Sequence, residues 1–170
     1  LGWRDERYQE VLFPDMLGWG AWVGSDFSEH FGFNLSYSRS DAIHRATVSP
    51  GRSTSASASA SIKPLRNIVI NPSVRWSRLV GDAGSTLFDG YIVRTRLDYQ
   101  ATRRLSARVV TEWNDFNGQL SIEPLVIYRI NPLSVAYLGS THGYRDFDEP
   151  FALEPTSRQF FLKLQYLLRP

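Results

Sequence analysis

The sequence predicts an all-β protein, built as an antiparallel up-and-down barrel with about nine strands in this chain. Two observations lead to this fold class. Apolar and polar residues alternate with a period of two along most of the chain, whereas helical periodicity is almost absent. Aromatic residues make up 14% of a chain whose mean hydropathy is only −0.27, and no stretch approaches the roughly 18 apolar residues of a transmembrane helix.

Composition excludes several classes of protein. The absence of cysteine removes disulfide scaffolds, thiolate metal sites and cysteine nucleophiles. Lysine and arginine (19) nearly balance aspartate and glutamate (17), which gives little support to a nucleic-acid binder driven by a basic field. With only three histidines, we expect no metal site, no cofactor and no nucleic-acid partner.

The alternating stretches are the predicted strands. They are residues 17–24, 31–39, 53–63, 68–78, 87–100, 105–114, 119–130, 134–144 and 158–168. Residues 1–16 are rich in charge and are expected as a loop or lead-in segment, which leaves residues 17–170 as the strands of the barrel.

The stretch 31–39 shows the alternation clearly, because Phe31 and Leu35 point one way while Asn34 and Ser36 point the other. The stretch 53–63 alternates serine with alanine. Its low complexity would also suit a flexible linker, but strict alternation between flanking strands favours a strand. The later stretches repeat the pattern with larger apolar residues and with arginine or glutamate on the polar side.

Connections of two lengths alternate along the chain. Short ones are expected near residues 26–30, 64–67, 102–104 and 131–133, and longer ones near 40–52, 80–86 and 145–157. The dipeptide Asn117-Gly118 predicts a tight turn. Outer-membrane barrels have short turns on one side and longer loops on the other, so this asymmetry favours that class.

The alternation alone does not say which face points inward, since a soluble lipocalin-like carrier would bury the apolar face that a membrane barrel turns toward lipid. The aromatic residues favour lipid, because they gather near strand ends as two girdles. The predicted girdle residues are Trp19, Phe31, Tyr37, Trp76, Tyr91, Tyr99, Trp113, Tyr144, Phe160 and Tyr166. The predicted charged residues of the lumen are Arg75, Arg94, Arg96, Asp98, Arg108, Glu112, Glu123, Arg129 and Lys163.

The C-terminal third carries a family resemblance. Its segments are Trp113–Phe116, Gln119–Leu125, Tyr128–Pro132, Tyr137–Gly139 and Arg158–Arg169, in that order. They resemble the barrel domain of an uncharacterised bacterial family, in which a carbohydrate-binding-like module precedes a large C-terminal outer-membrane β-barrel. Members are sometimes labelled membrane-associated hydrolases. The resemblance implies strands and turns but no catalytic residue.

Bacterial single-chain barrels have even strand numbers, and the first predicted strand would need an upward strand before it. We therefore expect this chain to be the C-terminal portion of a larger barrel, with a closed barrel of eight to ten strands as the alternative. The predicted role is non-enzymatic: a channel, or a membrane anchor and conduit for a surface or periplasmic module. Membrane lipid and the remaining barrel or other outer-membrane or periplasmic subunits are the expected partners.

Three groups of residues are candidates for chemistry. Ser140 and His142 share a face and could form a nucleophile–base pair, the basis of an alternative outer-membrane lipid or glycan hydrolase. Asp146, Asp148 and Glu149 could hold Ca²⁺ in a loop, although a solvated loop is the plainer interpretation. His30 and His44 are expected at the surface of a turn and a loop, and Arg94, Arg96, Arg108 and Arg129 could line an anion pore or pair with acids.

Overall fold

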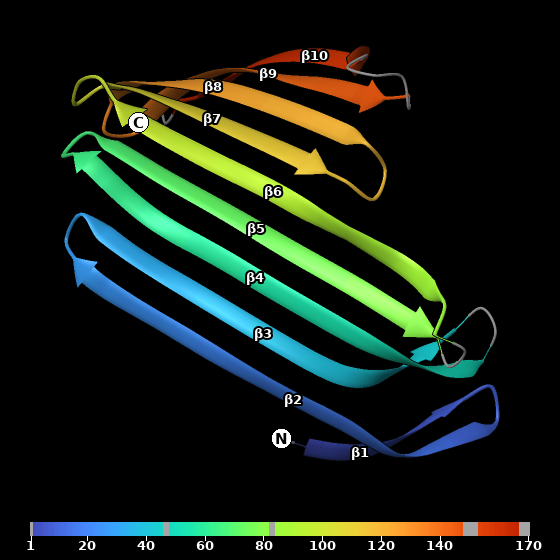
Figure 1. Cartoon of the computed structure of the whole chain (residues 1–170). Coiled ribbons are helices and arrows are strands. Elements are labelled where there is room, and N and C mark those ends of the chain that lie inside the picture. The colour runs from blue at the N-terminus through green and yellow to red at the C-terminus, as the bar shows by residue number, and fades with distance from the viewer. Residues whose placement is uncertain (1, 46–47, 82–83, 148–152, 167–170) are drawn as a thin grey trace.

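The computed structural model describes residues 2–45, 48–81, 84–147 and 153–166, and every regular element in this part of the chain is a β-strand (Figure 1). The strands are β1 (Gly2–Tyr8), β2 (Val11–Ser28), β3 (Phe31–His44), β4 (Ser49–Leu65), β5 (Ile68–Gly81), β6 (Thr86–Gln100), β7 (Leu105–Asn114), β8 (Gln119–Asn131), β9 (Ser134–Asp146) and β10 (Leu153–Gln165).

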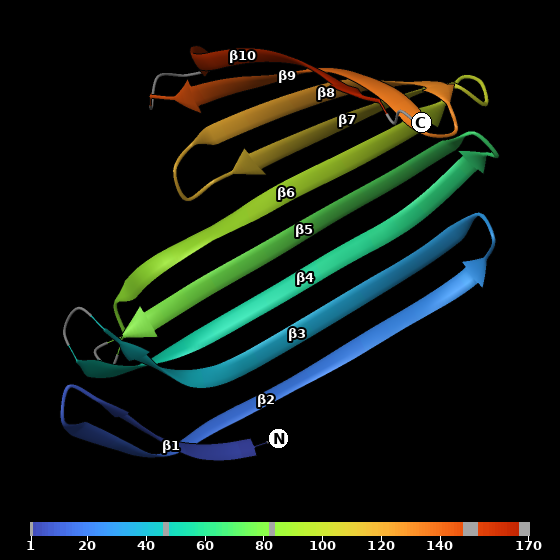
Figure 2. The same ribbon diagram turned by 180° about the vertical axis from the view of Figure 1, so that it is seen from behind.

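The strands form one antiparallel sheet in which each strand pairs with its neighbours in sequence. This confirms the predicted all-β, up-and-down fold, with ten strands instead of about nine. The sheet curls, so that β8–β10 turn across one end of the broad surface made by β2–β6 (Figures 1 and 2). It is not closed: among the described residues, β1 pairs only with β2, and β10 only with β9.

The prediction of a loop over residues 1–16 is wrong for its described part, because these residues form β1 and the start of β2. The two strands make a hairpin whose turn residues, Gln9 and Glu10, both have positive φ values of 46° and 65°. Such a turn matches the right-handed twist of the flanking strands. Charged residues on both sides of this hairpin hide the alternation that identified the other strands.

The prediction of a long connection over residues 40–52 is wrong, since β3 runs on to His44 and β4 begins at Ser49. The connection predicted near residues 80–86 is shorter but in place, because β5 ends at Gly81 and β6 begins at Thr86. In the extended ends of β3 and β4, polar and apolar residues occur on both faces, so the sequence periodicity disappears while the hydrogen-bonded ladder continues. The turn predicted at Asn117-Gly118 is present, and Gly118 has a φ of 61°.

The register separates the side chains onto two faces. What we call the apolar face comprises, on β3 to β9, Phe31, Phe33, Leu35, Tyr37, Ala56, Ala58, Ala60, Ile62, Ile70, Pro72, Val74, Trp76, Tyr91, Val93, Thr95, Leu97, Tyr99, Ala107, Val109, Thr111, Trp113, Leu120, Ile122, Pro124, Val126, Ala136, Leu138, Ser140, His142 and Tyr144. The residues between them on these strands make up the polar face.

Neither face is covered. Among the described residues only Phe13, Met16 and Val110 are buried hydrophobics, while Leu35, Val93, Leu97 and Leu164 are 45%, 38%, 37% and 63% exposed. The chain exposes 12449 Å², whereas a folded soluble monomer of 19.4 kDa exposes about 8,500 Å². The fold therefore leaves its apolar face available to another apolar medium.

Gly118 permits the turn between β7 and β8, and a side chain there would be strained by the left-handed backbone. We expect Gly118→Val to lower the free energy of unfolding by about 1–2 kcal/mol. Gly118→Asn is the matched control, because asparagine tolerates this conformation and should cost clearly less. Urea unfolding followed by tryptophan fluorescence measures both; equal losses in the two variants would contradict the conformational argument.

Candidate functional site

All nine residues predicted to line a lumen lie on the polar face: Arg75, Arg94, Arg96, Asp98, Arg108, Glu112, Glu123, Arg129 and Lys163. They come from β5 to β8 and from β10, so the register gathers charges that are distant in sequence. Whether they line a lumen stays a prediction, since the sheet is open.

Most of these charges are paired. Arg94 Nη1 lies 2.8 Å from Glu112 Oε2, across the β6–β7 pair. Asp98 lies between two arginines, with Arg96 Nε 2.6 Å from its Oδ2 and Arg108 Nε 2.8 Å from its Oδ1. Of the arginines considered for an anion pore, three are therefore engaged with acids, and Arg129 alone has no ion pair among the described residues. The nine residues comprise six cations and three anions, so this polar surface has a net positive charge.

A hollow of ≈ 350 Å³ lies on the polar face between β4 and β7, with Ser59, Ser73, Arg75, Arg94 and Glu112 among its lining residues. Toward β3 the face becomes a ladder of small hydroxyls: Ser36 and Ser57 are hydrogen-bonded at 2.7 Å, and Ser38 and Ser55 at 2.8 Å. These short side chains leave the polar face open over β3–β5.

The predicted aromatic girdle lies on the opposite face. Tyr37, Trp76 and Tyr91 lie in one cross-strand row with Ala56 between them, and Trp19 packs on Tyr37 with ring centroids 5.3 Å apart. Trp113 and Tyr144 continue in the next row, joined through Leu120. We call this set the upper aromatic row. It lies at the end of the sheet that carries the β3–β4 and β5–β6 connections.

Phe31 begins β3 and Tyr99 lies one residue before the end of β6, so both are at the opposite, short-turn end, and Tyr166 directly follows β10. Phe160 differs from its prediction. Because β10 begins at Leu153, Phe160 lies in the middle of the strand, opposite Ser140. The positions of the apolar face between the two ends include no Asp, Glu, Lys or Arg.

The structure brings Ser140 and His142 together. Both side chains lie on the apolar face of β9, with Ser140 Oγ 2.9 Å from His142 Nε2. Ser140 is nearly buried, and the Phe160 ring meets the imidazole edge-on at 5.8 Å. No carboxylate among the described residues orients the imidazole, and its cross-strand neighbours are Ile122 and Arg158. The pair has the contact that a nucleophile and its base need, without a third member.

The other candidates are dispersed. Asp146 ends β9, while Asp148 and Glu149 lie outside the described residues. His30 occupies the β2–β3 turn and His44 ends β3. Within the part of the chain that the structure describes, no group of three His, Cys, Asp or Glu residues could hold a metal ion.

One cluster was missed by sequence reasoning because its residues fell in predicted loops or at the ends of predicted strands. Beyond the upper aromatic row the apolar face continues with Arg39, Asp41, Arg52, Arg78 and Asp89. The signal in the sequence was the interval of two residues from Tyr37 to Arg39 and from Trp76 to Arg78, which places each pair on one face of a strand. The change from apolar to charged side chains along that face concealed it.

No described helix has the length and hydrophobicity required to cross a membrane. No protein-family model matches the chain, and no curated protein matches it either. The resemblance of the C-terminal third to a bacterial barrel family therefore stays a prediction.

The two arginines around Asp98 yield a prediction about stability. We expect Asp98→Asn to lower the free energy of unfolding by about 1 kcal/mol, because Arg96 and Arg108 would lose a shared partner on a half-exposed surface. Glu123→Gln is the control, since Glu123 has no ion pair among the described residues and should change stability by less than about 0.5 kcal/mol. Equal urea midpoints for the two variants would show that the cluster contributes nothing.

Proposed function

We propose that this chain forms part of the wall of an integral β-barrel of the bacterial outer membrane. It acts without catalysis, as a channel or as the membrane anchor and conduit for a surface or periplasmic module. The observation that supports this best is the apolar face, which is exposed and, on β3 to β9, carries no charged residue between its aromatic ends; on β10, Arg158 lies on this face beside His142. Behind it is a polar face on which Arg94, Arg96 and Arg108 are paired with acids. Lipid outside and water inside would satisfy both faces.

The dimensions agree with a membrane. From Tyr91 to Tyr99 on β6 the apolar face extends about 26 Å along the strand. At a tilt near 40° this is about 20 Å across the membrane, comparable to the roughly 25 Å apolar band of outer-membrane barrels. Tryptophan and tyrosine at the ends of such a band suit the interfacial region, where a ring has an apolar body and a polar tip.

The hollow on the polar face favours this proposal over the soluble lipocalin-like carrier. A carrier binds its ligand in a mostly apolar hollow, whereas Arg75, Arg94 and Glu112 are among the residues that line the hollow between β4 and β7. A barrel also has to satisfy the outer edges of β1 and β10, because hydrocarbon offers no hydrogen-bond partner to an open strand. Further strands, from a longer chain or another subunit, would complete the wall.

Adjacent residues on β4 provide the test. Ala58 lies on the apolar face beside Leu35 and Val74, and Ser59 lies on the polar face beside Asn34 and Ser73. In lipid, we expect Ala58→Arg to cost about 2–4 kcal/mol, as arginine does near the bilayer midplane, and Ser59→Arg to cost less than about 1 kcal/mol. Urea unfolding from phospholipid vesicles measures the difference, with the heat-dependent gel shift of the folded chain as the check on insertion.

A chain that tolerates both arginines equally would contradict the membrane proposal, and so would one that folds and stays monodisperse in buffer without detergent. Greater loss from Ser59→Arg than from Ala58→Arg would point instead to a soluble barrel whose polar face is enclosed.

A second candidate function is hydrolysis of membrane-lipid esters, favoured by the 2.9 Å contact between Ser140 Oγ and His142 Nε2. The pair lies on the apolar face, one and two same-face positions inside Tyr144, so a lipid ester would have to enter the apolar band to reach Ser140. His142 Nε2 would accept the proton as Ser140 Oγ attacks the ester carbonyl, and would return it to the leaving alcohol; water would then release the acid. The missing acid keeps this proposal second.

Hydrolysis of a fluorogenic phospholipid by the full chain in mixed micelles tests this candidate. Ser140→Ala and His142→Ala should each lower turnover by at least 100-fold, whereas Thr141→Ala, on the opposite face, should leave it within twofold. No turnover above micelles alone, or turnover that survives Ser140→Ala, would eliminate the hydrolase.

A further inference from the structure

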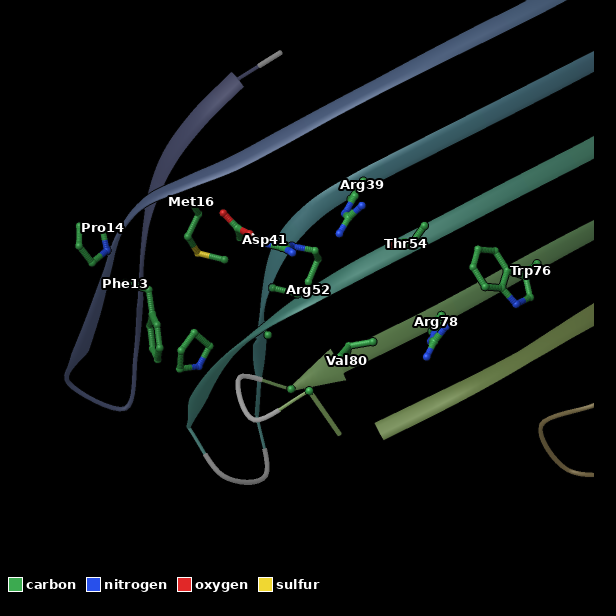
Figure 3. A pocket seen from close by; sticks show the side chains of 15 residues that line it. Phe13, Pro14, Met16, Arg39, Asp41, Arg52, Thr54, Trp76, Arg78 and Val80 are labelled. Atoms are coloured by element: carbon green, nitrogen blue, oxygen red, sulfur yellow. Dashed lines mark ion pairs between the residues drawn. The ribbon is translucent and has the colours of Figure 1, made fainter. Parts of the chain in front are cut away.

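The charged cluster beyond the upper aromatic row forms one wall of a pocket of ≈ 680 Å³ (Figure 3). Arg39 pairs with Thr54 across strands and Thr54 with Arg78, which places these side chains in the first row outside Tyr37 and Trp76. Arg52 and Asp41 pair with each other in the next row. The pocket thus begins where the apolar face ends.

The opposite wall is apolar and comes from the β1–β2 hairpin. Below Gly18, β2 leaves β3 and pairs with β1 alone, which brings Phe13, Pro14 and Met16 across from the arginines (Figure 3). Phe13 and Met16 are only 9% and 7% exposed, so this wall is packed. The Leu17 amide donates to Asp41 Oδ2 at 2.9 Å, which fixes the point where the hairpin departs.

Both carboxylates of the cluster, Asp41 and Asp89, accept hydrogen bonds from groups other than the arginines. Asp41 holds the Leu17 amide, and Asp89 Oδ1 accepts a 2.7 Å hydrogen bond from Trp76 Nε1. Their contacts to the arginines are long: Arg52 Nε lies 3.9 Å from Asp41 Oδ1, and Arg78 Nε lies 3.6 Å from Asp89 Oδ2. Charge-assisted hydrogen bonds are normally near 2.8 Å, so both guanidinium groups keep donors to offer.

Arg39 has no ion pair, because no carboxylate of the described residues lies within ion-pair distance of it. Arg52 and Arg78 are 58% and 44% exposed. Among the described residues, three guanidinium groups line this pocket with one carboxylate, that of Asp41, so their net charge is positive. Arg78 Nη2 donates to Thr86 Oγ1 at 3.0 Å, and the remaining N–H donors are open to a ligand. Guanidinium groups bind phosphate oxygens in a bidentate manner, so this chemistry suits a phosphate.

We infer that this pocket binds the phosphate headgroup of an anionic membrane lipid, an inference that rests on the proposed membrane function. In that setting the first row outside the aromatic residues is about 5 Å further along the membrane normal, at the depth of lipid phosphates. The arginines hold the phosphate, the hairpin covers the glycerol region with Phe13 and Met16, and the acyl chains run down the face past Trp76 and Val74. A free phosphate ion has no apolar part that could contact the apolar wall or the adjoining apolar face.

Binding to the detergent-solubilised full chain tests the inference, with dioctanoyl phosphatidic acid, dioctanoyl phosphatidylcholine and inorganic phosphate as probes in calorimetric titrations. We expect phosphatidic acid to bind at least tenfold more tightly than the other two. The double variant Arg39→Gln, Arg78→Gln should weaken phosphatidic acid binding at least tenfold. Arg75→Gln, which removes one positive charge from the polar face of β5, should stay within threefold.

Equal affinity for the two lipids, or an equal loss in Arg75→Gln, would overturn the inference. Inorganic phosphate binding as tightly as phosphatidic acid would reassign the pocket to a free anion and overturn the lipid site. The heat-dependent gel shift of each variant shows that it still folds. Failure of the membrane proposal is separate, because it appears as tolerance of Ala58→Arg, whereas failure of this site alone leaves that penalty intact.

Discussion

The structure depends on one constraint, the antiparallel register that is kept through the middle of β2 to β10. Because side chains alternate across a sheet, a slip of one residue would exchange its two faces. In these strands the register shifts lie near strand ends, as at Asp26/Ser28, Ile62/Leu65 and Leu79/Val80, whereas β1 is shifted in its middle. The central rows therefore stay in phase from β2 to β10 and separate most apolar from polar side chains; Trp22 and Phe161 on the polar face and Arg158 on the apolar face are among the exceptions.

This separation gives each face its own chemistry. On the polar face, water or a polar interior permits arginine and acid to lie close together, as in the Asp98 cluster. On the apolar face of β3 to β9, charged side chains are absent between the aromatic ends and return immediately beyond the upper aromatic row, at Arg39 and Arg78. The same face thus changes from apolar to charged side chains along the strand. On β5, Trp76 and Arg78 occupy successive positions of this face.

The energetics follow from the lack of a core. Three buried hydrophobic residues are far too few to offset the conformational entropy of ordering a chain of this length, so much of the stabilisation has to come from whatever covers the apolar face and the open edges. The buried Phe13 and Met16 belong to the β1–β2 hairpin, where polar residues prevail on the neighbouring strands. Local packing is thus concentrated where the apolar face gives way to charge.

Alternation in the sequence was sufficient to predict the fold class, the centres of nine strands, the two faces and the turn at Asn117-Gly118, because a period of two arises wherever the two faces meet different media. It was insufficient in the described parts of residues 2–16 and 40–52, where polar and apolar side chains follow one another without a period of two. Backbone hydrogen bonds continue the ladder there without leaving a pattern in the sequence. Only the tertiary structure decided that Arg96 and Arg108 share Asp98, that Ser140 contacts His142, and that the hairpin meets the arginines, since each depends on cross-strand register and sheet curvature.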